Sequence, residues 1–461
     1  MTTFVSVLYV LAFSLFIYGL MGLTGPRTAV RGNLIAATGM AIAVVAVLLT
    51  PRMGNWPLIA LGVALGTLVG VPAARTVKMT AMPQMVALFN GVGGGAVALI
   101  AFVEFRTTQG FAGEPAYVLV ASLFGAVVGS VSFWGSLVAF GKLQGLVPGR
   151  PIGLGQFQQV VNALLLAGAV GCAVAIGLGG HSELLMVGAL AFGAAFGVMV
   201  VLPIGGADMP VVISLLNALT GLSAAAAGLA LNITAMIVAG MIVGASGSIL
   251  TNLMAKAMNR SIPAIVRGGF GGGGGAAAVG VAGDRAVRET NAADAAIQLA
   301  YANQVIVVPG YGMAVAQAQY AVRDLAKLLE EKGVEVKYAI HPVAGRMPGH
   351  MNVLLAEADV PYEQLKDMDE INGEFSRTDL ALVIGANDVT NPAARNDPGS
   401  PIHGMPILNV DESKAVIVLK RSMNTGFAGI DNPLYYEPET EMLFGDAKAS
   451  VEAVTSELKA L

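Results

Sequence analysis

The stretch GGFGGGGGAAAVGVAG, residues 268–283, separates two parts of the chain that differ in composition. Glycine-rich sequence of this kind behaves as a flexible tether. Residues 1–270 hold 11 basic and 4 acidic side chains, a net charge of +7, whereas residues 271–461 hold 15 and 26, a net charge of −11. We expect a membrane domain at 1–267, a linker at 268–283 and an acidic soluble domain at 284–461. Neither charge suggests a nucleic-acid partner.

Before the linker, nine apolar windows each reach the length of a membrane span. The chain is 55% hydrophobic and only 12% charged, and no window contains an acidic, basic or histidine residue. The windows are 4–23, 33–50, 56–73, 85–103, 116–140, 160–178, 184–202, 211–229 and 233–254. Only helices satisfy their own backbone polar groups in lipid, so the sequence predicts a multi-pass bundle of nine helices. Glycine pairs at 125/129, 193/197 and 240/244 predict close approach between helices.

The loops between the windows indicate the orientation. Those after odd-numbered windows carry nine Lys or Arg residues, whereas those after even-numbered windows carry Arg52 and Arg106 alone. Basic loops stay on the cytoplasmic side. We therefore expect a protein of the cell inner membrane, surrounded by membrane lipids, with its C-terminal domain in the cytoplasm.

Beyond the linker, short apolar runs alternate with helical stretches. Strands are expected at 304–308, 335–340, 380–384 and 415–419, and helices at 313–332, 351–358 and 447–461. Strands that are apolar on both faces and separated by helices are typical of a parallel sheet covered on both sides. The predicted fold is thus a nine-helix membrane bundle followed by a Rossmann-like α/β domain.

A glycine-containing turn, Gly310-Tyr311-Gly312-Met313-Ala314-Val315, follows the first of these strands. A dinucleotide pyrophosphate binds at such a turn, where backbone N–H groups are accessible. Because the third glycine position is Val315, a plain tight turn is the alternative. The acidic residue that would hold an NAD ribose is missing, since Ile340 is followed by His341, and this argues against NAD(H).

Other polar residues follow the later strands. Lys420, Arg421 and Ser422 suit a 2′-phosphate, or else form a solvated strand end. Arg346 reaches either a phosphate or solvent. Asp388 is either a helix cap or an ionisable group beside a nicotinamide.

Metal chemistry is not expected. His341, His350 and His403 lack ligand spacing, and Cys172 is the single cysteine, so neither a disulfide nor a cysteine cluster can form. Hydride transfer needs no protein nucleophile, because the nicotinamide supplies the chemistry.

Seven longer segments carry a family resemblance. They are IGGADMPVVIS (204–214), KAMNRS (256–261), GYGMAVAQAQY (310–320), HPVAGRMPGHMNVLLAEA (341–358), GANDVTNPAA (385–394), KRSMNTGFAG (420–429) and MLFGDAKAS (442–450). With them the chain resembles, over essentially its whole length, the β subunit of the proton-translocating NAD(P) transhydrogenase. The resemblance implies that the cytoplasmic domain binds NADP(H) and that a partner α subunit binds NAD(H). It further implies a heteromer that dimerises, in which inward proton movement drives hydride transfer from NADH to NADP⁺.

The resemblance also implies roles for individual residues. The cofactor contacts would be Gly310, Tyr311, Gly312, Ala314, Val315, Arg346, Gly385, Ala386, Asn387, Asp388, Lys420, Arg421, Ser422, Gly426, Ala428, Gly429, Asp446 and Ala447. Residues 426–432 would form a lid, and Asp388 would be the catalytic residue that links nucleotide state to proton state.

The sequence departs from the family pattern at one position of the expected proton pathway. Asn90 stands where some bacterial members carry a histidine. Asparagine cannot titrate. The relay must therefore come from the α subunit, from Asp208 at the mouth of the eighth helix, or from water held by Asn90, Ser214 and Asn217.

Two other classes of protein fit the architecture. A transporter or channel with a cytosolic dinucleotide-sensing domain would need a substrate site, yet the apolar windows show neither a charge nor a helix-breaking repeat. A membrane anchor for a soluble dehydrogenase would not explain Asn90 and Asn217 inside apolar helices.

Overall fold

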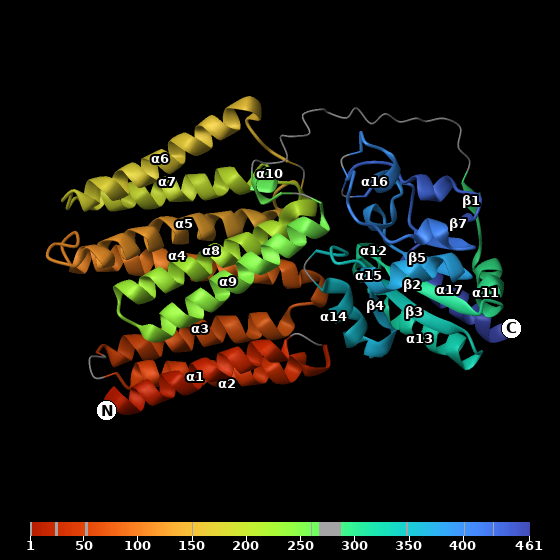
Figure 1. Cartoon of the computed structure of the whole chain (residues 1–461), viewed down its shortest axis with the longest axis horizontal. Helices are drawn as coiled ribbons and strands as arrows, with labels where there is room; N and C mark the ends of the chain where they lie inside the picture. Colours follow the sequence, from red (N-terminus) through yellow and green to blue (C-terminus); the bar gives the residue numbers. More distant parts are fainter. Residues whose placement is uncertain are drawn as a thin grey trace. The chain divides into compact units, whose positions relative to one another are not determined.

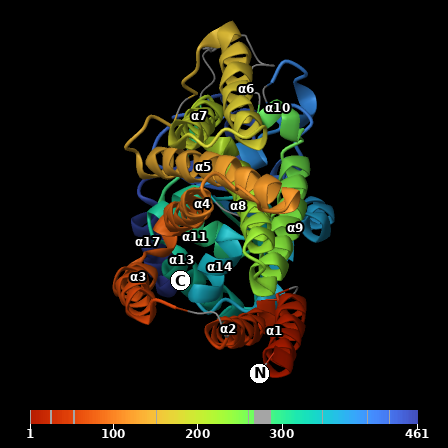
Figure 2. The ribbon, with the colours of Figure 1, turned by 90° about the vertical axis from the view of Figure 1, so that its left-hand side faces the viewer.

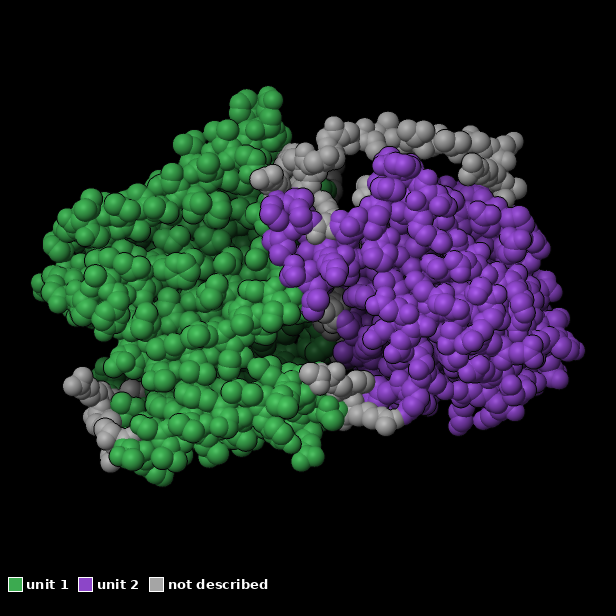
Figure 3. All heavy atoms as spheres, viewed as in Figure 1, with its two compact units in different colours: residues 1–204, 212–251, 266–268 green, residues 205–211, 252–265, 269–461 purple. Residues whose placement is uncertain are grey.

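The computed structural model describes residues 2–23, 26–50, 54–149, 151–259, 261–266, 287–346, 349–400, 402–426 and 428–461. The predicted linker at 268–283, both domain boundaries beside it, and Phe427 of the predicted lid lie outside these residues. The chain divides into two compact units (Figure 3). The first comprises Met1–Ile204, Val212–Thr251 and Val266–Gly268, and the second comprises Gly205–Val211, Asn252–Ile265 and Gly269–Leu461.

Nine helices in the described residues are long and apolar enough to cross a membrane (Figure 1). They are α1 (Thr2–Gly22), α2 (Pro26–Leu48), α3 (Trp56–Thr76), α4 (Met82–Thr107), α5 (Ala116–Gln144), α6 (Gln158–Gly177), α7 (Glu183–Val201), α8 (Met209–Ala230) and α9 (Thr234–Ala257). Short connections include η1 (Met79–Ala81), η2 (Gly155–Phe157), η3 (Gly206–Asp208) and α10 (Ile262–Val266). The predicted nine-helix membrane part is confirmed. Helix α3 buries none of its residues. Its apolar surface therefore needs lipid or another protein around it.

Close approach between helices, predicted from the glycine pairs, is also confirmed (Figure 2). A Cβ atom at Gly129 of α5 would lie 2.7 Å from the carbonyl oxygen of Gly94 in α4. A Cβ at Gly240 of α9 would lie 2.5 Å from the backbone nitrogen of Ala225 in α8. Glycine at these positions lets the helix backbones touch directly.

The windows contain no charged residue, but six helices extend past them and take in charged residues near their ends: α2, α3, α4, α5, α7 and α9. Helix α4 continues through Glu104, and α5 continues through Lys142. Lys142 is buried, and its ammonium donates to the carbonyl oxygens of Leu202 and Ile204, the latter at 2.7 Å. These carbonyls follow the end of α7, where helix carbonyl groups lack intrahelical partners. An apolar window ends at the first charged residue, whereas the backbone hydrogen bonds of the helix continue past that residue.

The second unit contains a seven-stranded, all-parallel sheet in the order β1-β7-β6-β5-β2-β3-β4, which confirms the predicted α/β class. The strands are β1 (Arg288–Glu289), β2 (Gln304–Pro309), β3 (Glu335–Ile340), β4 (Leu365–Asp367), β5 (Leu380–Ile384), β6 (Val416–Lys420) and β7 (Thr440–Phe444). The helices are α11 (Ala292–Ala300), α12 (Tyr311–Val315), α13 (Gln319–Glu331), α14 (His350–Glu357), α15 (Met368–Ile371), α16 (Ala393–Asn396) and α17 (Ala447–Ala460). Short 3₁₀ turns are η4 (Tyr362–Gln364), η5 (Asn372–Arg377), η6 (Asp388–Thr390), η7 (Val410–Glu412) and η8 (Pro433–Tyr436).

The core of the sheet is apolar on both faces, as expected for a buried parallel sheet. All six residues of β2 and all five of β5 are buried. Ile306 and Val383 pack with Phe375 of η5 and Leu434 of η8, which belong to the irregular layer on one face. Helix α17 contacts both α11 and α13, and these three helices form a separate helical layer (Figure 1).

Two details differ from the sequence prediction. The helix expected at 313–332 is two helices, α12 and α13, because the chain turns at Gln317, whose φ is +51°. The strands β1, β4 and β7 and the helix α11 were not expected. Strand β7 carries Glu441, which pairs with Arg288 of β1 at 2.9 Å. Because this charge interrupts the apolar run, the sequence pattern did not indicate a strand there.

Candidate functional site

The order of the strands places the candidate site. From β2 the chain continues to β3 on one side, and it later returns to β5 on the other side of β2. Ligands of open parallel sheets bind outside the carboxyl ends of the strands at such a reversal. The predicted residues after β2, β3, β5, β6 and β7 all follow carboxyl ends at this one edge.

The turns after β2 and β5 meet backbone to backbone. A Cβ at Gly310 would lie 2.3 Å from the carbonyl oxygen of Gly385, and one at Gly312 would lie 2.7 Å from the Gly385 Cα. The N–H of Gly310 donates to Ile384 at 2.9 Å, and that of Gly312 donates to Gly385 at 2.9 Å. Glycine is therefore needed here for close packing of two turns, and these two N–H groups already have protein acceptors.

Arg346, in the loop after β3, lies against the turn after β2. Its guanidinium carbon is 4.4 Å from the centre of the Tyr311 ring, a stacked geometry that holds the cation in place. The backbone N–H of Arg346 donates to Nδ1 of His350 at 3.0 Å. His350 is buried, and burial, followed by the charge of Arg346, lowers the pKa of His350 to about 4. A neutral imidazole thus fixes the loop that carries Arg346.

Asp388, just after β5, contacts the segment predicted to be a lid. Its Oδ2 accepts a hydrogen bond from the N–H of Ala428 at 3.0 Å. Gly426 lies so close that an added Cβ would be 2.6 Å from Asp388 Oδ1 and 3.0 Å from Asn387 Nδ2. Asp388 is the first residue of the turn η6, whose N-cap residue Asn387 makes no side-chain cap hydrogen bond. Within the described residues, the predicted lid and Asp388 come together.

Lys420 ends β6 beside the same segment. Its ammonium donates to the carbonyl oxygen of Asn424 at 2.6 Å and lies 4.6 Å from the centre of the Tyr435 ring. Burial lowers the pKa of Lys420, whereas the nearby carboxylates of Asp431 and Asp388 act in the opposite direction. Arg421 and Ser422 are exposed. Lys420 is therefore fixed in position, while its two neighbours face solvent.

Several predicted residues do not join these contacts. Ala314 is fully buried in the α12 turn, and Val315 is largely exposed. Asp446 is the N-cap of α17, where it accepts from the N–H groups of Lys448 and Ala449, and Ala447 is buried in that helix. All four follow the carboxyl ends of strands, and Asp446 stabilises the start of α17.

Three residues that fix the site were not singled out from the sequence. Buried Asn432 donates to the carbonyl oxygen of Asn387 at 3.1 Å, and buried Asn391 donates to that of Asp431 at 3.0 Å. Tyr435 donates to the carbonyl oxygen of Ala386 at 3.4 Å. Both asparagines precede a proline, and Asn-Pro dipeptides are a turn signal that would have identified them.

In the first unit, Asn90 belongs to a buried polar cluster. Its Nδ2 donates to Oγ of Ser136 at 2.9 Å and contacts Oγ of Ser132 at 3.5 Å, both on α5. Ser132 in turn hydrogen bonds to Thr220 and donates to the Leu216 carbonyl oxygen at 3.0 Å, both on α8. The sequence analysis singled out Asn90 as a proton-pathway residue, but it did not single out Ser132, Ser136 or Thr220.

The other predicted proton-pathway residues lie outside this cluster. Ser214 donates to the carbonyl oxygen of Gly247 in α9 at 3.2 Å. Asp208 is buried in η3, before the first residue of α8. Asn217 is half-buried on α8. Among the described residues, no group of three His, Cys, Asp or Glu side chains is placed to hold a metal ion.

Comparison with known proteins identifies the family of the chain. The family model described as "NAD(P) transhydrogenase beta subunit" matches residues 5–457. Two sequences from Rhodospirillum rubrum, both described as "NAD(P) transhydrogenase subunit beta", are each 48% identical to this chain over 452 residues, which is 97% of both chains. The motifs that carried the resemblance therefore led to the correct family. The chain belongs to the NAD(P) transhydrogenase beta subunit family.

Proposed function

We propose that this chain is the membrane subunit of an enzyme that transfers hydride from NADH to NADP⁺ and couples the transfer to proton movement into the cell. The second unit binds NADP(H), and a partner α subunit binds NAD(H), in a heteromer that dimerises. One observation carries the assignment to this unit: the glycine turns, Asp388 with its lid contact, and Lys420 all follow neighbouring strands at one sheet edge. The family assignment favours this reaction over a transporter, a channel or a simple anchor.

The side chains at this edge fit a phosphorylated dinucleotide. Lys420 and Arg421 supply positive charge and Ser422 a hydroxyl in consecutive positions, a donor set suited to a 2′-phosphate. Arg346, held on Tyr311, can meet a second phosphate. When bound, NADP⁺ supplies the hydride-accepting nicotinamide.

Asp388 connects the sheet to the lid. As a carboxylate it accepts a charge-assisted hydrogen bond from Ala428, and such bonds are about twice as strong as neutral ones. Protonation of Asp388 removes the charge and weakens its hold on residues 426–432. Proton state would thus alter how firmly the lid is held, and hence the affinity for NADP(H).

The test uses the full complex, with the chain co-expressed with its α subunit in membrane vesicles. NADPH formation from NADH should accelerate under a proton gradient and slow when an uncoupler is added. Asp208→Asn or Asn217→Leu should lower coupled turnover and proton pumping in parallel, and should lower NADP(H) affinity much less. A reaction that is insensitive to the uncoupler would contradict proton coupling. The absence of any hydride transfer would contradict the enzyme assignment.

Orientation has its own test. The basic loops support an external N-terminus and a cytoplasmic C-terminus. A C-terminal reporter fusion should be active on the cytoplasmic side. Activity on the external side alone would reverse the proposed direction of every helix.

A further inference from the structure

Helices α4, α5 and α8 meet along a line of small and polar residues, called here the α4–α5–α8 seam. On α5 it comprises Ser122, Gly125, Gly129, Ser132 and Ser136, whose three- or four-residue spacing places them on one helix face. All five are buried. The Asn90 cluster occupies one stretch of this seam, because Ser132 and Ser136 are its α5 members.

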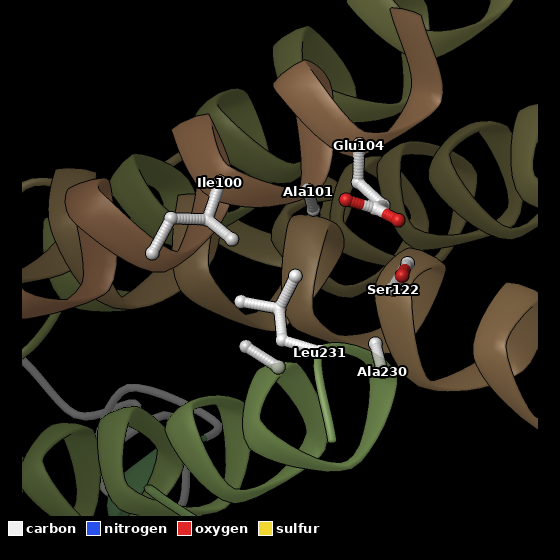
Figure 4. A pocket seen from close by; sticks show the side chains of 7 residues that line it. Ile100, Ala101, Glu104, Ser122, Ala230 and Leu231 are labelled. Atoms are coloured by element: carbon white, nitrogen blue, oxygen red, sulfur yellow. The ribbon is translucent and has the colours of Figure 1, made fainter. Parts of the chain in front are cut away.

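Glu104 of α4 lies at the other end of the seam. It lines a cavity of about 10 Å³ together with Ser122 of α5 and with Ala227, Ala230 and Leu231 from the end of α8. Figure 4 shows the Glu104 carboxylate and the Ser122 hydroxyl on one side of this cavity, with the aliphatic side chains of Ile100 and Leu231 across from them. A volume of about 10–15 Å³ is the lower limit for one water molecule, and a carboxylate and a hydroxyl give it polar partners.

The positions along the helices place Glu104 and Asp208 at opposite membrane faces. Glu104 is beside the C-terminal end of α8, whereas Asp208 precedes the first residue of α8. A helix of 22 residues is about 33 Å long, enough to cross the hydrocarbon core. Asn90 lies 14 residues before Glu104 on α4, or about 21 Å along the helix axis. The seam therefore has a carboxylate at one face and a hydrogen-bonded cluster farther inside.

Among the residues that the structure describes, no cation forms an ion pair with the Glu104 carboxylate. Arg106, two residues on, pairs instead with Glu183 at the start of α7, at 3.0 Å and largely exposed to solvent. Glu114, in the loop after α4, is close enough to act on Glu104 and carries the same charge. The other cavity residues contributed by α5 and α8 cannot titrate. Glu104 lies at the end of α4 beside an apolar cavity, where a charged carboxylate is less well solvated than in water.

We propose that Glu104 is a proton-carrying residue of the membrane domain, at the face opposite Asp208. Its carboxylate takes a proton from water at that face and releases it to water in the α4–α5–α8 seam, so its charge returns to the starting state in each cycle. The inference rests on the proposed proton translocation. It supplies the membrane part with a titratable group that Asn90 cannot provide.

The experiment compares Glu104→Gln, Glu104→Asp and Glu183→Gln in the complete complex in sealed vesicles. Glu183→Gln is the matched control, because it removes the same charge at the same membrane face from an exposed side chain. Glu104→Gln should lower proton pumping and coupled NADPH formation at least about tenfold, as expected for loss of a positioned proton-transfer group. NADP(H) affinity and assembly should be unchanged. Glu104→Asp should keep pumping but change its dependence on the pH at that face, and Glu183→Gln should match the parent.

A spectroscopic readout separates proton binding from a packing role. In a pH titration followed by infrared spectroscopy, the parent should show a carboxylic-acid C=O band that Glu104→Gln lacks and Glu183→Gln retains. If Glu104→Gln fails to assemble, a parent-like pH dependence of pumping in Glu104→Asp overturns the proposal. Full pumping by Glu104→Gln overturns the role of Glu104 alone, whereas a parent complex that transfers hydride without pumping overturns the proposed coupling as well.

Discussion

Replacing Gly426 with alanine tests whether the 426–432 segment is held on Asp388. The added Cβ would lie 2.6 Å from Asp388 Oδ1 and 3.0 Å from Asn387 Nδ2. Both separations are too short for an ordinary contact, so either the carboxylate or the segment must move. The contact that this movement disrupts is the 3.0 Å hydrogen bond from the Ala428 N–H to Asp388 Oδ2.

The magnitude follows from the kind of bond that is lost. A hydrogen bond to a charged group contributes about 1.5–3 kcal/mol, which corresponds to about ten- to hundredfold in a binding constant. If the cofactor binds beneath the segment, as proposed above, Gly426→Ala should weaken NADP(H) binding by about that factor. Gly373→Ala is the control. It adds the same atom where nothing lies within 4 Å, and NADP(H) affinity should be unchanged.

A double-mutant cycle with Asp388→Ala identifies the cause. Without the Asp388 carboxylate, the added methyl group meets only Asn387 Nδ2 at 3.0 Å, so Gly426→Ala should then cost less binding free energy than it does in the parent. The assay is titration of each variant with NADPH, followed by fluorescence or calorimetry. If Gly426→Ala binds NADPH like the parent, or loses the same factor in both backgrounds, the segment is not held through Asp388.

Three further predictions concern the second unit. Lys420→Ala or Arg421→Ala should weaken NADP(H) binding about ten- to hundredfold and NAD(H) binding only slightly, and equal losses in parallel titrations would indicate a solvated strand end. Gly310→Ala places a Cβ 2.3 Å from a backbone oxygen that cannot rotate away, so it should destabilise the unit by about 3 kcal/mol, and an unchanged melting temperature would contradict this. Burial lowers the pKa of His341 to about 4 from an ordinary 6.5, so the contribution of neutral His341 to stability is complete above pH 6.5 and is lost as the pH falls toward 4. His341→Gln should flatten urea-unfolding stability across that pH range, and an unchanged pH dependence would assign it to other groups.

The parts of the fold that follow from burial were predictable. Membrane helices and the central strands β2 and β5 are apolar on every side, so their sequences are diagnostic. Charged residues end the apolar windows, but the helices continue past them. Glu104 and Lys142 were therefore placed outside the predicted helices, although they lie within α4 and α5. Strand β7 was missed because Glu441 interrupts its apolar pattern, and only its pairing with β1 and β6 explains a strand there.

The candidate site was predictable where one motif follows one strand. The turns that begin at Gly310 and Gly385 are examples, since strand order alone brings them together. The contacts between distant segments were not predictable. Asn432 reaches Asn387 across 45 residues, and Lys142 reaches Ile204 across 62. Such bonds depend on tertiary structure, which a local pattern does not encode.

The strengths of these bonds indicate where a proton can change nucleotide affinity. A tenfold change in NADP(H) affinity needs about 1.4 kcal/mol. Hydrogen bonds between neutral side chains in a membrane bundle average about 0.6 kcal/mol, so rearrangement of the single Asn90 to Ser136 bond falls short. The charge-assisted bond from Ala428 to Asp388 exceeds the requirement at about 1.5–3 kcal/mol. We therefore infer that the membrane residues carry the proton, whereas the change in affinity arises at Asp388. A coupling energy below about 0.5 kcal/mol in the Gly426 and Asp388 cycle would place that change elsewhere.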